Sequence, residues 1–163
     1  PHRPAGWPGI LAIGLTDSPG GAAHLRSHTH VRMRYQYLAG GLNTGSGWAT
    51  WNQPAGEFAA LYIAESRAAG IIPVFSYYQL QQSSPGAGMA EDAAIRTNLR
   101  NRATMTAFYR DLILLFRMAH RTPSTKVVVQ VEPDMWGYVE QASRGDDART
   151  VPAVVAGSAP VRR

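Results

Sequence analysis

The sequence contains no cysteine, which excludes disulfides, thiolate zinc sites and a cysteine nucleophile. Charged residues make up only 17% of its 163 residues, and no apolar run approaches the roughly 20 residues of a membrane span. It also lacks the G-x-S-x-G, Walker and G-x-G-x-x-G motifs of esterases, nucleotide hydrolases and dehydrogenases. We therefore expect no membrane partner and no cofactor.

Lysine is almost absent too, since Lys126 is the only one among 16 basic residues. The formal net charge is +5, and a basic balance can indicate nucleic-acid binding. No nucleic-acid-binding motif accompanies the charge, however, and we expect six of the arginines to form the solvated face of one long helical segment. These are Arg96, Arg100, Arg102, Arg110, Arg117 and Arg121.

Three histidines, His24, His28 and His30, lie close together in the sequence and superficially suggest a metal site. They precede an expected strand, so they belong to the opposite end of the sheet from the acidic residues discussed below. No carboxylate lies near them in the sequence to complete a ligand set. We therefore predict no metal.

Four short apolar runs recur, each followed by a polar, glycine-rich or proline-rich stretch. Their length and their β-branched residues favour strands over helices. The four predicted strands are Ile10–Leu15, Val31–Leu38, Ile71–Tyr77 and Lys126–Val131.

Segments with helical periodicity lie between and after the later strands, in Gly56–Ala69, around Met105–His120 and, more briefly, in Met135–Ala142. Gly21–His28 is too short and too broken by its pattern to predict a helix. Alternating strands and helices are typical of parallel β/α units. The sequence predicts one domain over residues 1–163 with an α/β fold, a partial parallel (β/α) barrel of TIM type. About four to five units are present, because Val151–Ala156 resembles the start of a fifth strand, against the eight of a complete barrel.

Two carboxylates, Glu132 and Asp134, directly follow the fourth strand, where barrels build their active sites. A pair of carboxylates is what glycoside hydrolysis requires, one to protonate the leaving oxygen and one to act as base or nucleophile. Both are therefore our catalytic candidates. The competing interpretation is a structural ion pair between Glu132 and an arginine such as Arg34.

Aromatic residues are concentrated after the second, third and fourth strands. Flat aromatic faces stack on sugar rings, and polar side chains among them supply hydrogen bonds. Asp17 ends the first strand and is either a substrate contact or an ordinary turn residue. Any single aromatic residue is more readily explained by packing, but together they predict a substrate-binding set. Its members are Asp17, Tyr35, Tyr37, Trp48, Trp51, Tyr77, Tyr78, Gln79 and Trp136.

Three stretches of the sequence resemble secreted bacterial glycoside-hydrolase-like barrels. They are Tyr35–Gly41 with the following Asn43-Thr44-Gly45, Trp48–Asn52, and Val131–Tyr138. The resemblance extends from about Ile10 to Ala156. Glu132-Pro133 is similar to the Asn-Glu-Pro motif of the retaining barrel glycosidases, although Val131 replaces the asparagine. Glu132-Pro133-Asp134 is similar to the Glu-Pro-Asp motif of the inverting family-six cellulases. The first resemblance favours Glu132 as the acid and the second favours Asp134.

The resemblance implies a secreted hydrolase acting on a β-linked polysaccharide such as cellulose. A non-catalytic carbohydrate-binding relative, or an inactive half barrel, is the alternative. An isolated half barrel would expose the two edges of its sheet. We therefore expect it to pair with a second copy, to swap elements, or to be incomplete.

Overall fold

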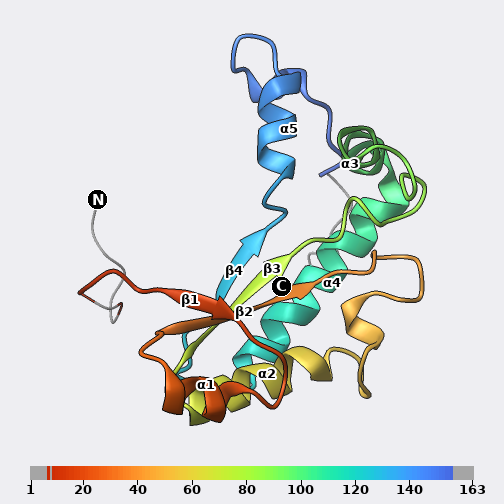
Figure 1. Ribbon diagram of the computed structural model, residues 1–163. Coiled ribbons are helices and arrows are strands. Elements are labelled where there is room, and N and C mark those ends of the chain that lie inside the picture. Colours follow the sequence, from red (N-terminus) through yellow and green to blue (C-terminus); the bar gives the residue numbers. More distant parts are fainter. Residues whose placement is uncertain (1–6, 8, 156–163) are drawn as a thin grey trace.

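The computed structural model describes residue 7 and residues 9–155 and contains a parallel sheet of four strands (Figure 1). The strands are β1 (Gly14–Thr16), β2 (Met33–Leu38), β3 (Ile72–Tyr77) and β4 (Val128–Val131). Each pairs in parallel with the next, so the order in space is the order in the chain. All four strands were predicted from the sequence. The first is shorter than expected, because residues 10–13 lie outside it and are largely exposed.

Helices connect the strands as the periodicity predicts, with two differences. The helices are α1 (Ala22–His28), α2 (Glu57–Ala68), α3 (Glu91–Arg100), α4 (Arg102–His120) and α5 (Met135–Ala142). The doubtful first helix is present, and the segment expected to be one long arginine-bearing helix is two helices. Asn101 divides them, because its extended backbone ends α3 while its side chain caps α4 by accepting the amide of Thr104 at 3.0 Å.

One face of the sheet is covered by the helices. Figure 1 shows α1, α2 and α4 gathered along one side of the strands, whereas α5 projects beyond the carboxyl end of β4. Alternate strand residues point to this side, and they are buried against α2 and α4. The main contributors from the sheet and these helices are Leu38, Phe75, Tyr77, Tyr62, Ile63, Phe108 and Leu115.

The other face of the sheet carries no helix among the described residues, and we call it the open face. The strand register places Met33, Tyr35 and Tyr37 of β2 beside Val74 and Ser76 of β3. Ser76 in turn is paired with Gln130 of β4. These side chains line a shallow hollow of about 390 Å³.

The described sheet is not closed, so β1 and β4 form its edges. The prediction of a fifth strand at Val151–Ala156 is wrong for the described residues 151–155 and cannot be assessed for Ala156, which lies outside them. Instead of joining the sheet, this segment turns back onto α3, where the amide of Val154 donates to the carbonyl oxygen of Leu99 at 2.8 Å. None of the described helices combines the length and the apolar character that a membrane span requires.

Candidate functional site

Glu132 lies at the carboxyl end of β4 and is completely buried. Its amide extends the sheet by donating to the carbonyl oxygen of Tyr77 at 2.7 Å, and its backbone then turns with φ 47°. That turn directs the carboxyl group towards the loop after β3. There Oε1 accepts the backbone amides of Gln79 and Leu80 at 2.8 and 3.1 Å. Oε2 is buried and has no hydrogen-bond partner among the described residues.

The environment of Glu132 favours its protonated form. Burial raises the pKa of the carboxyl group from its ordinary value of 4.5 to about 7, although the two amide hydrogen bonds act in the opposite direction. A buried carboxyl group with a raised pKa at a strand end is typical of a general acid. The unpartnered Oε2 is the oxygen available to carry the proton.

This pKa shift predicts that Glu132 contributes less to the stability of the protein at neutral pH than at mildly acidic pH. The folded state holds the proton of Glu132 more tightly than the unfolded state, so the contribution of this group to stability is greatest below pH 4.5 and falls as the pH rises towards 7. At about 1.4 kcal/mol per pKa unit, the loss from this group is about 3 kcal/mol. Urea unfolding at several pH values measures this decrease in the free energy of unfolding, and Glu132→Gln should remove most of the decrease. An unchanged pH dependence in that variant would contradict the shift.

Asp134, the other catalytic candidate, has a very different environment. It is exposed at the position before α5 and makes no capping hydrogen bond with its side chain. Together with Pro133, Gly137, Tyr138 and Gln141 it lines a surface hollow of about 260 Å³. The two carboxylates are thus two residues apart in the chain, one buried and one exposed to solvent.

The interpretation that pairs Glu132 with Arg34 is wrong. Arg34 is buried on the helix-covered face, where Nη1 contacts Asp17 at 2.6 Å and Nη2 contacts Glu65 at 2.8 Å. Its guanidinium also lies 3.8 Å from the ring centroid of Tyr62. Asp17 is therefore held in an ion pair and does not project freely from the end of β1.

Two of the aromatic candidates belong to the core. Trp48 and Tyr77 are fully buried, and both donate to Oδ2 of Asp111, at 2.6 and 2.8 Å. Asp111 was not anticipated, because its position in α4 gives no sign of these partners. Gln79 is buried as well and donates to the carbonyl oxygen of Leu38 at 2.7 Å. In this structure, none of the three candidates presents a surface to a ligand.

Three tyrosines, Tyr35, Tyr37 and Tyr78, remain accessible and meet edge to face. The ring centroids of Tyr35 and Tyr37 are 6.2 Å apart, and those of Tyr37 and Tyr78 are 6.4 Å apart. Tyr37 is 49% exposed, and the hydroxyl of Tyr78 donates to Glu91. We call this group the tyrosine cluster.

Two residues beside the tyrosine cluster were missed from the sequence. Ser76 donates to Oε1 of Gln130 at 3.3 Å, and both line the open face next to Tyr37. Strand parity would have found them, because residues two apart along a strand share a face.

The two other tryptophans of the predicted substrate-binding set, Trp51 and Trp136, are exposed but lie apart from the tyrosine cluster in the sequence and contact other residues. Trp51 packs its ring edge-on against Phe58 with centroids 4.9 Å apart, and Trp136 donates to the carbonyl oxygen of Val131 at 2.8 Å. They are 45% and 61% exposed. Each side chain is held by the contact just described, yet enough of its ring surface is exposed for stacking.

The described residues contain no group of three or more His, Asp or Glu side chains that could hold a metal ion. His24 and His28 stack on each other with ring centroids 4.1 Å apart. No family model matches the chain, and neither the curated proteins nor the solved structures contain a match to it.

Proposed function

We propose that the four β/α units belong to a (β/α) barrel that hydrolyses a β-linked polysaccharide at the carboxyl ends of its strands. The observation that carries this proposal is Glu132, a buried carboxyl group with a raised pKa at the end of a parallel strand. The strand order and the placement of the helices on one face support the barrel, since the other face would then line its interior.

In this mechanism, protonated Glu132 donates its proton to the glycosidic oxygen as the bond to the anomeric carbon breaks. A water molecule attacks the anomeric carbon and transfers its proton to a carboxylate, for which the exposed Asp134 is our candidate. Two carboxyl groups in contrasting environments are the usual basis for dividing acid and base roles. The tyrosine cluster would bind the neighbouring sugar rings.

A second function, carbohydrate binding without turnover, is favoured by a different observation. Glu132 is completely buried, and its Oε1 accepts two backbone amides, so the side chain also fastens the loop after β3. If that is its whole role, the tyrosine cluster still offers a binding surface but no acid reaches the substrate.

The first experiment incubates the chain with cellulose, xylan, mannan and mixed-linkage glucan. It measures separately the retention of the protein on each polymer and the reducing ends released from it. We expect retention on at least one polymer, with release from the same polymer. Retention without release favours the binding function, and the absence of both contradicts the two functions together.

Replacing Tyr37 with alanine should weaken binding to the polymer by about ten- to a hundredfold, because burying an aromatic side chain against a ligand contributes about 1.5–3 kcal/mol. Phe116→Ala is the matched control, since Phe116 is similarly exposed, at 53%, but lies on α4. Affinity electrophoresis in gels containing the polymer measures both variants. Equal weakening by the two substitutions would show that the tyrosine cluster is not the binding surface.

A further inference from the structure

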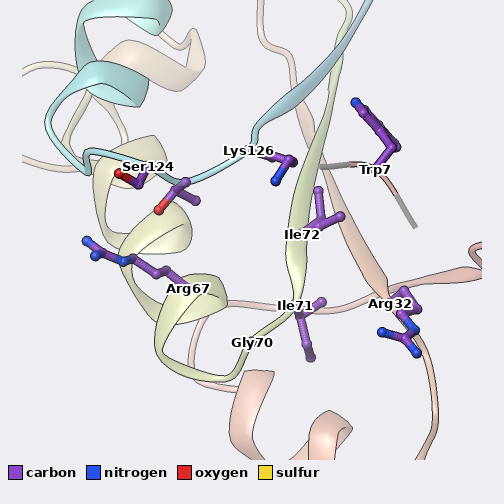
Figure 2. A pocket seen from close by; sticks show the side chains of 9 residues that line it. Trp7, Arg32, Arg67, Gly70, Ile71, Ile72, Ser124 and Lys126 are labelled. Atoms are coloured by element: carbon purple, nitrogen blue, oxygen red, sulfur yellow. The ribbon is translucent and has the colours of Figure 1, made fainter. Parts of the chain in front are cut away.

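Two hollows at opposite ends of the strands differ in the groups that meet in them. One, of about 350 Å³, lies at the amino ends. Figure 2 shows that the charged ends of its three cations, Arg32, Arg67 and Lys126, are directed away from one another, so they do not converge on one ligand. The other, of about 260 Å³, lies beyond the carboxyl end of β4 beside α5, and we call it the Asp134 hollow.

One face of α5 and the residues before it form the Asp134 hollow. Its lining residues are Pro133, Asp134, Gly137, Tyr138 and Gln141. Positions three or four apart share a face of a helix, which is why positions 134, 137, 138 and 141 meet here. The hollow therefore offers an aromatic ring, a carboxylate and an amide. These are groups that stack on a sugar ring and form hydrogen bonds with its hydroxyls.

Glu91, the first residue of α3, joins the Asp134 hollow to the tyrosine cluster. It accepts the hydroxyl of Tyr78, a member of the cluster. Partial burial raises the pKa of the Tyr138 hydroxyl, and the charge of Glu91 and a hydrogen bond with that carboxylate raise it further. Tyr78 of the loop after β3 and Tyr138 of α5 therefore meet at one carboxylate. The tyrosine cluster thus continues past Glu91 to the Asp134 hollow.

The charges around the Asp134 hollow indicate which sugars it fits. None of its described lining residues is cationic. Among the described residues, neither Asp134 nor Glu91 forms an ion pair. Two uncompensated carboxylates repel a sugar that carries a carboxylate of its own. The hollow therefore fits a neutral sugar ring better than an acidic one.

We infer that the Asp134 hollow is a subsite for one neutral sugar ring, with Tyr138 as the stacking residue and Glu91 as the positioning residue that holds the Tyr138 hydroxyl. This inference rests on the proposed function, because the polymer then runs from the tyrosine cluster past Glu91 to Asp134. It adds two residues, Tyr138 and Glu91, that the predicted substrate-binding set does not contain. It also places a sugar ring beside Asp134, the candidate base.

Gly137 provides the direct test of the subsite. A Cβ at this helical position would meet no heavy atom within 4 Å beyond its chain neighbours and its own helix backbone. Gly137→Leu therefore fills the hollow without a clash, and leucine is the better helix former. Calorimetric titration with oligosaccharides of increasing length, prepared from the polymer that retains the wild-type chain, measures the affinity. We expect wild type to gain about tenfold in affinity from short to long oligosaccharides, and Gly137→Leu to lose that gain while it binds the short ones normally.

Substitutions of Tyr138 and Glu91 test their roles in the same titration. Tyr138→Ala should lose the same gain, and Glu91→Ala should weaken binding of long oligosaccharides severalfold and of short ones less. Glu91→Gln should restore most of the affinity, because its amide oxygen still accepts the tyrosine hydroxyls. Equal weakening for short and long oligosaccharides would overturn the positioning role. Glu140→Ala is the matched control, because Glu140 is exposed on α5 and does not line the hollow.

Oligosaccharides of galacturonic acid, whose rings carry carboxylates, provide a second arm. Their affinity should be the same for wild type and Gly137→Leu, and a loss in the variant would overturn the assignment to a neutral sugar. If Gly137→Leu binds long neutral oligosaccharides as tightly as wild type, or if Glu140→Ala weakens binding as much as Tyr138→Ala, the subsite is overturned and the tyrosine cluster keeps its proposed role. Retention on no polymer at all would overturn the proposed function and this inference with it.

Discussion

Glu132→Gln is expected to lower the release of reducing ends by about 10²–10⁴-fold, the usual contribution of a positioned general acid. The glutamine side chain matches glutamate in shape and keeps an oxygen that can accept the amides of Gln79 and Leu80. It cannot donate a proton to the leaving oxygen as a carboxylic acid does. Initial rates on the polymer that retains the wild-type chain measure the effect.

The same variant separates the two proposed functions, because retention on the polymer should stay within about twofold of wild type if the fold is intact. Asp134→Asn tests the second carboxylate, and its exposed position removes any concern about folding. An active Glu132→Gln variant would exclude Glu132 as the acid and leave it the role of fastening the loop after β3. If Asp134→Asn alone abolished release, the acid would be Asp134.

The parallel sheet was predictable from the sequence because its strands are short apolar runs bounded by glycine and proline. The run Ile71–Tyr77 shows why, since Gly70, with φ 68°, ends α2 immediately before the strand begins. The start of α3 as a separate helix was missed for an equally local reason. Ala90 provides no side-chain cap at its start, and only the acidic first turn of Glu91 and Asp92 indicates a helix.

The accessibility of the aromatic residues was not predictable, because a run of residues does not show which side chains meet a partner distant in the sequence. Trp48 and Tyr37 both belong to the predicted substrate-binding set, yet Trp48 is fully buried and Tyr37 is 49% exposed. Trp48 packs in the core and donates its indole N–H to Asp111, 63 positions further along the chain, whereas Tyr37 lines the open face. Strand parity alone does separate Tyr37, on the open face, from Leu38, in the core.

For Glu132, one feature was predictable from the local sequence and another depends on residues distant in the chain. Its position at a strand end was predictable from the sequence, and that position directed attention to it. Its pKa is raised by burial, and its two amide donors belong to the loop after β3, more than 50 positions earlier in the chain. A local motif therefore locates a candidate acid, while its burial in the folded chain, which the motif does not show, favours the protonated carboxyl group.

Arg34→Met should destabilise the fold by about 3–5 kcal/mol, the cost of removing one partner from a buried ion pair. Arg34 is fully buried, and its guanidinium is shared by Asp17 and Glu65. Methionine fills part of the volume but leaves both carboxylates without their cation. Because Asp17 follows β1 and Glu65 belongs to α2, the loss should loosen the first β/α unit from the second, which thermal or urea unfolding measures.

The pH dependence of this loss identifies its electrostatic origin. Burial alone would raise the pKa of Glu65, but hydrogen bonds from Arg34 and from the amides of Ala22 and Gly20 outweigh it and hold the pKa below its ordinary value. This contribution is therefore present above the unfolded pKa of Glu65 and is lost as the pH falls through its folded pKa. The difference between wild type and Arg34→Met should shrink in acid. Arg32→Met, two positions away and exposed, should change stability by less than about 0.5 kcal/mol. If both substitutions had the same cost at every pH, the stability of the first two units would not depend on the Arg34 ion pairs.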